Sequence, residues 1–153
     1  MRRILLSFLI VAPSLFAEDT PHCKQVGGAI LTNFIGPTTT LGTATGDLRG
    51  GLGVNVLNVT PGPNGSAVFH NHHQWVTESG DTIFFADADA RAYPTPAGVF
   101  GTAYTNGVQI TGGTGRFAGA SGKLAIYGAV DLTQGQIILR YSGQVCFKSG
   151  PTP

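Results

Sequence analysis

Apolar and polar residues alternate along most of this chain, in runs that are interrupted by turn-forming residues. A period of two residues is typical of β-strands that bury one face. After residue 17, no helix-length stretch is free of Gly, Pro or β-branched residues, so no amphipathic helix is expected. We expect strands over residues 24–35, 43–59, 66–78, 81–93, 99–111, 121–132 and 136–147. The second is long enough to bend or split at Gly50-Gly51, so the count is seven or eight.

The alternation also predicts which side chains face inward. In the last expected strand, one face carries the apolar residues Ile137, Leu139, Tyr141, Val145 and Phe147. The strand before it places Leu124, Ile126 and Val130 on one face. One apolar face and one polar face on each strand predict an all-β fold, a small closed antiparallel β-barrel of about eight strands.

The third and fourth expected strands form a hairpin at Ser79-Gly80. A two-residue turn there would place Glu78 opposite Asp81 and fix the register of the whole pair. The predicted inner face then carries Phe69, Asn71, His73 and Trp75 opposite Ala90, Ala88, Ala86 and Phe84. The predicted outer face carries Val68, His70 and His72 opposite Arg91, Asp89 and Asp87.

The predicted inner face makes His73 and Asn71 the first candidates for a binding site. A buried imidazole or amide must find hydrogen-bond partners, which in an apolar barrel can be a ligand, water or each other. The alternative is a core histidine satisfied by a neighbouring backbone group or tyrosine. Trp75, Tyr104 and Tyr141 are candidates to line the same cavity, with core packing as the alternative role.

The outward histidines suggest a metal site with two histidines and two carboxylates: His70, His72, Asp87 and Asp89. The alternative is a pair of exposed cross-strand His–Asp contacts. We favour the second interpretation, because metal ligands are usually held by outer-shell partners and the sequence identifies none. No metal and no cofactor are therefore expected.

Composition and charge agree with a turn-rich β protein. Glycine supplies 23 of 153 residues and charged residues only 11%, which favours tight turns over helices. A formal net charge of +1 offers no basic face for nucleic acid. The two cysteines, Cys23 and Cys146, lie near opposite ends of the chain and predict one disulfide. That bridge would make the first and last strands neighbours, as a closed barrel requires.

The amino terminus has the form of an export signal. Met1-Arg2-Arg3 precedes an apolar run over residues 4–12 that is too short to span a bilayer. We expect a signal peptide over residues 1–17, with cleavage after Ala17, and a single domain over residues 18–153. A twin-arginine signal is the less favoured interpretation of Arg2-Arg3. The protein is expected to be secreted or periplasmic, with no membrane span.

A glycine-rich segment follows the fifth expected strand and continues into the sixth: Gly112-Gly113-Thr114-Gly115-Arg116-Phe117-Ala118-Gly119-Ala120-Ser121-Gly122. Because no helix follows it, we interpret it as a structural turn and not as a dinucleotide-binding loop. It resembles the Gly-Gly-Thr/Ser-Gly-x-Phe-x-x-Ala-x-Gly motif of allene oxide cyclase and dirigent barrels, and most of all the bacterial secreted proteins described as allene oxide cyclase barrel-like.

The resemblance implies an eight-stranded antiparallel barrel whose characterised relatives guide the cyclisation or coupling of a reactive small molecule. Such catalysis acts through positioning and exclusion of water. The plant cyclases use a cavity carboxylate, but after cleavage the glutamates of this chain are Glu18 and Glu78, at the new terminus and in a turn. No catalytic residue is carried over from the family.

Two functional hypotheses follow. The first is a secreted barrel that binds a small hydrophobic molecule and guides its cyclisation or isomerisation, with His73 and Asn71 as its polar contacts. The second is a non-catalytic exported binding or envelope-associated scaffold protein. Outward apolar residues, expected to include Ile83, Phe85 and Ile138, would suit a homo-oligomer.

Overall fold

The structure is a computed structural model and describes residues 21–95 and 98–148. The predicted signal peptide over residues 1–17 lies outside these residues. Within them, no helix has the length and hydropathy of a membrane-spanning segment. The strands are β1 (His22–Phe34), β2 (Thr39–Ala44), β3 (Gly50–Pro61), β4 (Ala67–Thr77), β5 (Thr82–Phe85), β6 (Ala88–Pro94), β7 (Val99–Tyr104), β8 (Val108–Gly113), β9 (Ser121–Asp131) and β10 (Gln136–Phe147).

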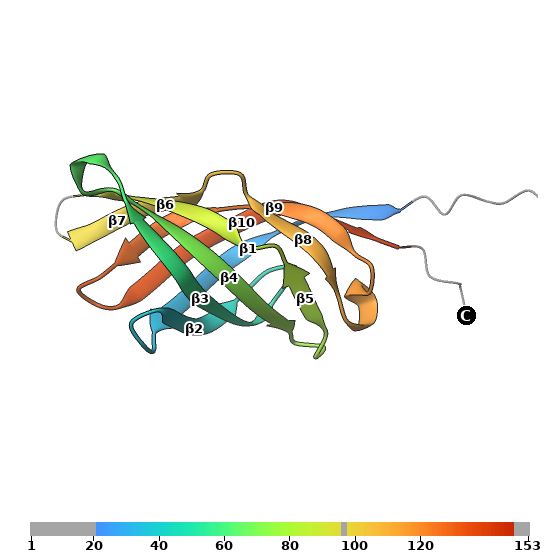
Figure 1. The fold of residues 1–153 in the computed structure, drawn as a ribbon. Coiled ribbons are helices and arrows are strands. Elements are labelled where there is room, and N and C mark those ends of the chain that lie inside the picture. The colour runs from blue at the N-terminus through green and yellow to red at the C-terminus, as the bar shows by residue number, and fades with distance from the viewer. Residues whose placement is uncertain (1–20, 96–97, 149–153) are drawn as a thin grey trace, which may run out of the picture.

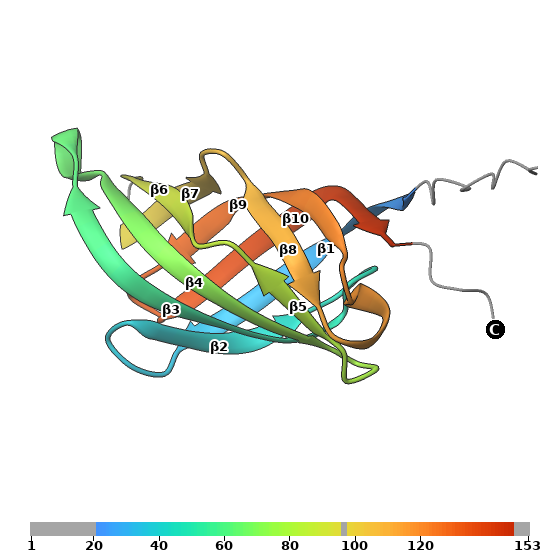
Figure 2. The same cartoon turned by 45° about the vertical axis from the view of Figure 1, so that its right-hand side comes forward.

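The strands close into an eight-stranded antiparallel barrel, as the sequence predicts (Figures 1 and 2). Strands β1 to β4 pair in chain order, β9 pairs with β10, and β10 pairs with β1. Two positions of the barrel are each shared by two short strands, because β4 pairs with both β5 and β6 while β9 pairs with both β7 and β8. The fourth and fifth expected strands are therefore each interrupted, and the second is divided into β2 and β3.

A predicted disulfide reinforces the seam between the first and last strands. Cys23 lies directly opposite Cys146 in the β1–β10 ladder, and the two are bonded. The ladder itself runs from His22–Phe147 to Asn33–Gln136. The barrel is closed at this seam by backbone hydrogen bonds along both strands and by a covalent link near the chain ends.

The β4–β5 hairpin differs from its predicted register. The backbone N–H of Thr77 donates to the carbonyl of Asp81, so the turn contains three residues, with Gly80 at a φ of 86°. Trp75 therefore pairs with Ile83, one residue away from the predicted pairing. An irregular connection at residues 86–87 restores the predicted register beyond it, where Asn71 pairs with Ala88 and His70 with Asp89.

This one-residue slip exchanges the two faces of β5. Ile83 and Phe85, which we expected on the outer surface, are buried with 1% and 8% exposure. Phe84, which we expected inside, is 49% exposed, and Ala86 is also exposed. The expected apolar outer surface therefore lacks Ile83 and Phe85, although Ile138 is exposed as predicted.

One end of the barrel is filled by side chains. Leu48 from the β2–β3 connection and Phe117 from the 3-10 turn η3 (Gly115–Phe117) are buried there with Trp75 and Tyr141. The glycine-rich motif is therefore a structural turn that carries Phe117 into the core. Gly113 within it has no room for a side chain, because an added Cβ would lie 2.5 Å from that of Phe117. Strand β1 begins and strand β10 ends at this end of the barrel (Figure 1).

Candidate functional site

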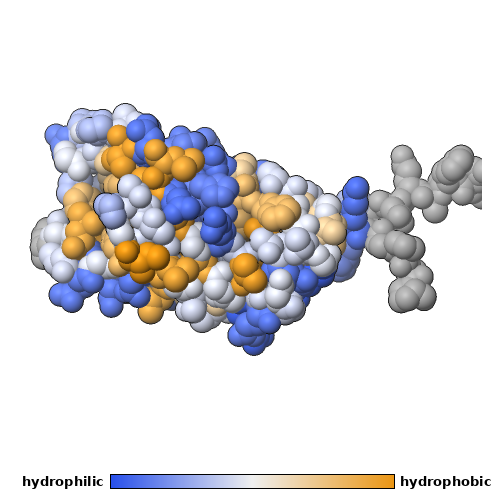
Figure 3. Space-filling model, turned by 60° about the horizontal axis from the view of Figure 1, so that its bottom comes forward, coloured by the Kyte–Doolittle hydropathy of each residue, from blue (hydrophilic) through white to orange (hydrophobic). Residues whose placement is uncertain are grey.

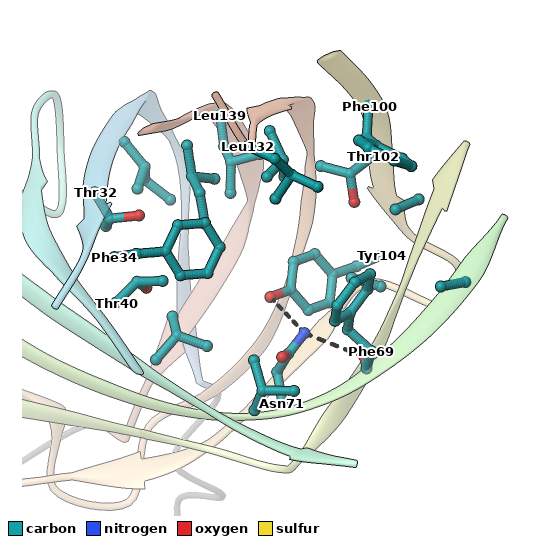
Figure 4. A pocket seen from close by; sticks show the side chains of 18 of the residues that line it. Thr32, Phe34, Thr40, Phe69, Asn71, Phe100, Thr102, Tyr104, Leu132 and Leu139 are labelled. Atoms are coloured by element: carbon teal, nitrogen blue, oxygen red, sulfur yellow. Dashed lines mark hydrogen bonds between the residues drawn. The ribbon is translucent and has the colours of Figure 1, made fainter. Parts of the chain in front are cut away.

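An apolar cavity of about 280 Å³ occupies the other half of the barrel. It extends toward the end formed by the connections β1–β2, β3–β4, β6–β7 and β9–β10. Gly65 and Leu132 line it and are exposed, so the cavity reaches the surface at this end. Figure 4 shows side chains from opposite walls of the barrel pointing into it.

Small side chains on one wall create the space. Ala67, Ala90 and Ala92 on β4 and β6 face inward, where each contributes a single methyl group. The opposite wall carries larger residues, including Ile30, Ile137 and Leu139. The alternation of β6 places its alanines inside and its charged residues Asp89 and Arg91 outside. A wall of alanines facing larger aliphatic side chains leaves the barrel interior open at this level.

The lining is neutral. Within the described part of the chain, every residue that lines the cavity is uncharged, and most are apolar. The polar lining residues are Thr32, Thr40, Asn71, Thr102 and Tyr104. The aromatic residues Phe34, Phe69 and Phe100 stand around the same space (Figure 4).

Asn71 and Tyr104 form the polar spot of the cavity. The Asn71 Nδ2 group donates to the Phe69 carbonyl at 3.1 Å and to the Tyr104 hydroxyl at 3.3 Å. Asn71 is only 4% exposed, and β4 presents it toward the cavity. Its amide orientation is fixed by the Phe69 carbonyl, which accepts only from a donor. None of the described residues donates to the Asn71 carbonyl oxygen, which is therefore available as an acceptor.

His73 lies behind this spot, below the level of the cavity. Its Nε2 is 2.8 Å from the Tyr104 hydroxyl, and its ring lies between those of Tyr104 and Phe85. The direction of this hydrogen bond depends on the histidine tautomer, and the Tyr104 hydroxyl donates to His73 Nε2 when that nitrogen carries no hydrogen. The proton of the neutral imidazole is then on Nδ1, a buried atom that has no hydrogen-bond partner among the described residues.

Burial changes the pKa values of both His73 and Tyr104. It lowers the pKa of His73 from 6.5 to about 4, because the charged imidazolium is poorly solvated there, and the charge of His72 adds a smaller effect in the same direction. Burial also raises the pKa of Tyr104 well above its ordinary value of 10.0. The imidazole and the phenol are therefore both neutral at physiological pH.

Tyr104 separates the cavity from a second, much smaller space. A void of about 20 Å³ lies on its far side and is lined by His73, Trp75 and Phe85, among others. Such a volume is close to the minimum that one water molecule needs. The structure thus brings Asn71 and Tyr104 to the main cavity, and His73 and Trp75 to the small void beneath it.

The other two aromatic candidates make structural contacts. The Trp75 indole N–H donates to the Leu48 carbonyl at 2.7 Å. The Tyr141 hydroxyl donates to the Thr45 carbonyl at 2.8 Å and accepts from the Leu48 N–H at 2.9 Å. Their rings contact each other edge to face, with centroids 5.3 Å apart. Both residues hold the β2–β3 connection against the closed end, and Tyr141 is not among the residues that line either space.

Sequence reasoning missed the polar lining residues Thr32 and Thr102, and it also missed Thr40. Thr40 is 2% exposed, and its hydroxyl has no hydrogen-bond partner among the described residues. The strand that holds it was expected to begin only at residue 43, so Thr40 was not assigned to either face. Its pairing with Phe34 and Val54 in the β1–β2–β3 sheet places it inside.

The outward histidines form two separate cross-strand contacts. His70 Nδ1 lies 2.8 Å from Asp89, and His72 Nδ1 lies 2.7 Å from Asp87. These are the His–Asp contacts that the sequence favours. Residues 21–95 and 98–148 contain no group of three or more His, Cys, Asp or Glu side chains arranged to hold a metal ion.

Comparison with known proteins adds a structural likeness. Among solved structures, the chain is similar to a pterocarpan synthase dirigent protein. The identity is 15% and the TM-score 0.37, over 93% of this chain and 98% of that chain. No protein-family model and no curated protein matches the sequence.

Proposed function

We propose that this barrel binds a small, neutral, hydrophobic molecule in its cavity. The observation that carries the proposal is the apolar cavity of about 280 Å³ with an opening at one end of the barrel. Its size is close to the lower limit of ligand pockets, which are about 300 to 1,000 Å³. An enclosed apolar site with a few polar groups is the usual form of a small-molecule site.

The neutral lining restricts the chemistry of the ligand. A carboxylate or ammonium group would lose its hydration in the cavity and find no counterion on the wall. A hydroxyl or N–H group would find an acceptor in the Asn71 carbonyl oxygen, and Thr40 offers a hydroxyl on another wall. We therefore infer that an uncharged ligand with one or two hydrogen-bonding groups fits best.

Guidance of a cyclisation or isomerisation is a second candidate function, supported by the enclosed shape of the site. Holding a flexible molecule in one conformation and excluding water can accelerate such a reaction without an acid or base. Tyr104 and His73 are poorly suited to proton transfer at neutral pH, because the pKa of His73 is about 4 and that of Tyr104 is raised. In the proposal, Tyr104 and His73 shape the cavity and orient the ligand. This role is equally compatible with a non-catalytic exported binding protein.

The Cys23–Cys146 disulfide supports an exported protein, since disulfides persist mainly in oxidising compartments. Export agrees with the predicted signal peptide over residues 1–17. It would give the barrel access to small molecules outside the cytoplasm.

A neutral fluorescent probe, N-phenyl-1-naphthylamine, tests the binding proposal. We expect saturable fluorescence enhancement with one probe for each chain. Ala92→Phe fills the cavity, because Ala92 lines it and is 3% exposed, and should weaken binding at least about tenfold. Ala103→Phe is the matched control, since Ala103 is exposed on β7 and pairs with the outward residues Arg91 and Tyr127.

Equal probe affinities in the wild type and both variants would contradict the proposal, as would a signal that does not saturate. If the probe binds as expected, mass spectrometry of small molecules retained by protein purified from its native source would identify the natural ligand. Incubation with that molecule distinguishes the two functions: a guiding enzyme converts it to an isomer, and a binding protein returns it unchanged.

A further inference from the structure

His70 and His72 stand side by side on the outer wall of the barrel. They are two residues apart on β4, a spacing that directs both side chains to the same face of the strand. Each side chain is 44% exposed. His73, the next residue along, points to the opposite face and is buried, so it takes no part in this arrangement.

Each of these imidazoles is held by a carboxylate, one on β6 and the other in the connection between β5 and β6. Asp89 lies 2.8 Å from Nδ1 of His70, and Asp87 lies 2.7 Å from Nδ1 of His72. A carboxylate accepts the Nδ1 hydrogen and leaves the lone pair of a neutral imidazole on Nε2. None of the described residues hydrogen-bonds to either Nε2.

This is the arrangement in which metal-binding histidines are usually found. A histidine that ligates a metal through one nitrogen generally donates its other N–H to a carboxylate, which fixes the tautomer and the ring orientation. The sequence alone suggested that Asp87 and Asp89 could be metal ligands. In the structure, each aspartate instead contacts the Nδ1 atom of one histidine. This position suits an outer-shell partner of a metal site and not a direct metal ligand.

The surroundings favour a cation. On the β3 side, His70 pairs with Asn58 and His72 pairs with Asn55, both neutral. On the other side, Asp89 of β6 and Asp87 of the β5–β6 connection bring negative charge. Lys123 lines the same groove as His70, Asp87 and Asp89, and two carboxylates against this one ammonium still leave the groove negative.

The geometry points to a two-histidine metal site on the outer wall of the barrel. We infer that His70 and His72 bind a divalent first-row transition ion such as Zn²⁺ through their Nε2 atoms, with Asp87 and Asp89 as outer-shell partners. Imidazole nitrogens suit Zn²⁺, Cu²⁺ and Ni²⁺, whereas Mg²⁺ and Ca²⁺ prefer oxygen ligands. Two protein ligands leave the other coordination positions of the ion to water or to a group from another molecule.

Calorimetric titration of the tag-free protein with zinc chloride tests this site. We expect one Zn²⁺ for each chain and no binding of Mg²⁺. His70→Ala and His72→Ala should each weaken Zn²⁺ binding at least about tenfold. His22→Ala is the matched control, because His22 lies at the start of β1 and belongs to neither His–Asp pair.

The outer-shell role has its own test. Asp87→Asn and Asp89→Asn keep the shape of the side chain but remove its charge, and each should weaken Zn²⁺ binding by about 10- to 100-fold. All these positions are exposed, and unchanged thermal melting without zinc would show that the variants fold. Absence of zinc binding, binding that is lost only in His22→Ala, or binding unaffected in both asparagine variants would overturn the inference.

Discussion

The Tyr104 hydroxyl lies 2.8 Å from Nε2 of His73, so a phenol that lines the cavity is tied to an imidazole beneath it. Asn71 completes this arrangement by donating to the same hydroxyl. The three side chains come from only two strands, β4 and β7, which have no direct pairing with each other and are joined through β6. The hydrogen bonds among these three side chains link β4 to β7 and fix the inner end of the cavity, which we call the cavity floor.

Removal of the Tyr104 hydroxyl should therefore affect stability more than binding. In Tyr104→Phe, His73 Nε2 and Asn71 Nδ2 both lose a partner in a buried place, which should lower the free energy of unfolding by about 1–3 kcal/mol. Urea denaturation measures this change. Affinity for N-phenyl-1-naphthylamine should change less than about threefold, because the aromatic wall of the cavity is retained.

Tyr127→Phe is the control for that experiment. Tyr127 is 51% exposed on β9, and the substitution should change the free energy of unfolding by less than about 0.5 kcal/mol. A Tyr104→Phe protein as stable as Tyr127→Phe would show that the hydroxyl does not hold the cavity floor.

Protonation of His73 should make the fold sensitive to mild acid. The folded-state pKa is about 4 and the unfolded-state value is 6.5, so between these values the unfolded chain binds a proton that the folded protein does not. Stability present above about pH 6.5 is then lost as the pH falls toward 4. At about 1.4 kcal/mol for each pKa unit, the loss between pH 7 and pH 4.5 is on the order of 2–3 kcal/mol.

Urea titrations at these two pH values measure that loss. His73→Gln should reduce it, because glutamine keeps a hydrogen-bonding side chain but does not titrate, whereas His22→Gln should leave it unchanged. The pKa values of Asp47 and Asp131 are lowered from 3.8 by hydrogen bonds, so these carboxylates act at lower pH and do not account for the same loss. An acid sensitivity that persists in His73→Gln would assign it to other groups.

The period of two residues was enough to predict much of the barrel interior. It placed Leu139, Tyr141 and Val145 inside on β10, and each is at least nine-tenths buried. The two cysteines predicted the seam between β1 and β10, because a closed barrel brings the first and last strands together. These features follow from local alternation and from one long-range constraint.

The faces of β5 could not be obtained in the same way. Gly80 has a positive φ in the observed three-residue turn, and a glycine at this place is equally compatible with the predicted two-residue turn. A difference of one residue exchanges Phe84 for Phe85 in the core. The hydrogen-bond partner of His73 could not be predicted from the sequence either, because Tyr104 lies 31 residues away on another strand.

The disulfide should contribute strongly to stability. Cys23 and Cys146 are 123 residues apart, and a bridge across such a long loop restricts the unfolded chain by about 4–5 kcal/mol in the chain-entropy model. Because native strain and residual structure reduce this figure, we expect Cys23→Ala with Cys146→Ala to lower the free energy of unfolding by about 2–4 kcal/mol. Urea denaturation of the double variant, and of the wild type with and without dithiothreitol, measures it. Equal midpoints in all three would show that the β1–β10 ladder closes the barrel unaided.

Tyr141 should behave as a structural residue and not as a ligand-binding one. Its hydroxyl holds the β2–β3 connection through Thr45 and Leu48, and burial raises its pKa. Tyr141→Phe leaves the Leu48 N–H without its acceptor, so the free energy of unfolding should fall by about 1–3 kcal/mol, as measured by urea denaturation. Affinity for N-phenyl-1-naphthylamine should be unchanged, because Tyr141 does not line the cavity and Leu48 and Trp75 lie at the same closed end. A Tyr141→Phe protein of normal stability that binds the probe weakly would instead place the ligand deeper in the barrel, beyond Tyr104.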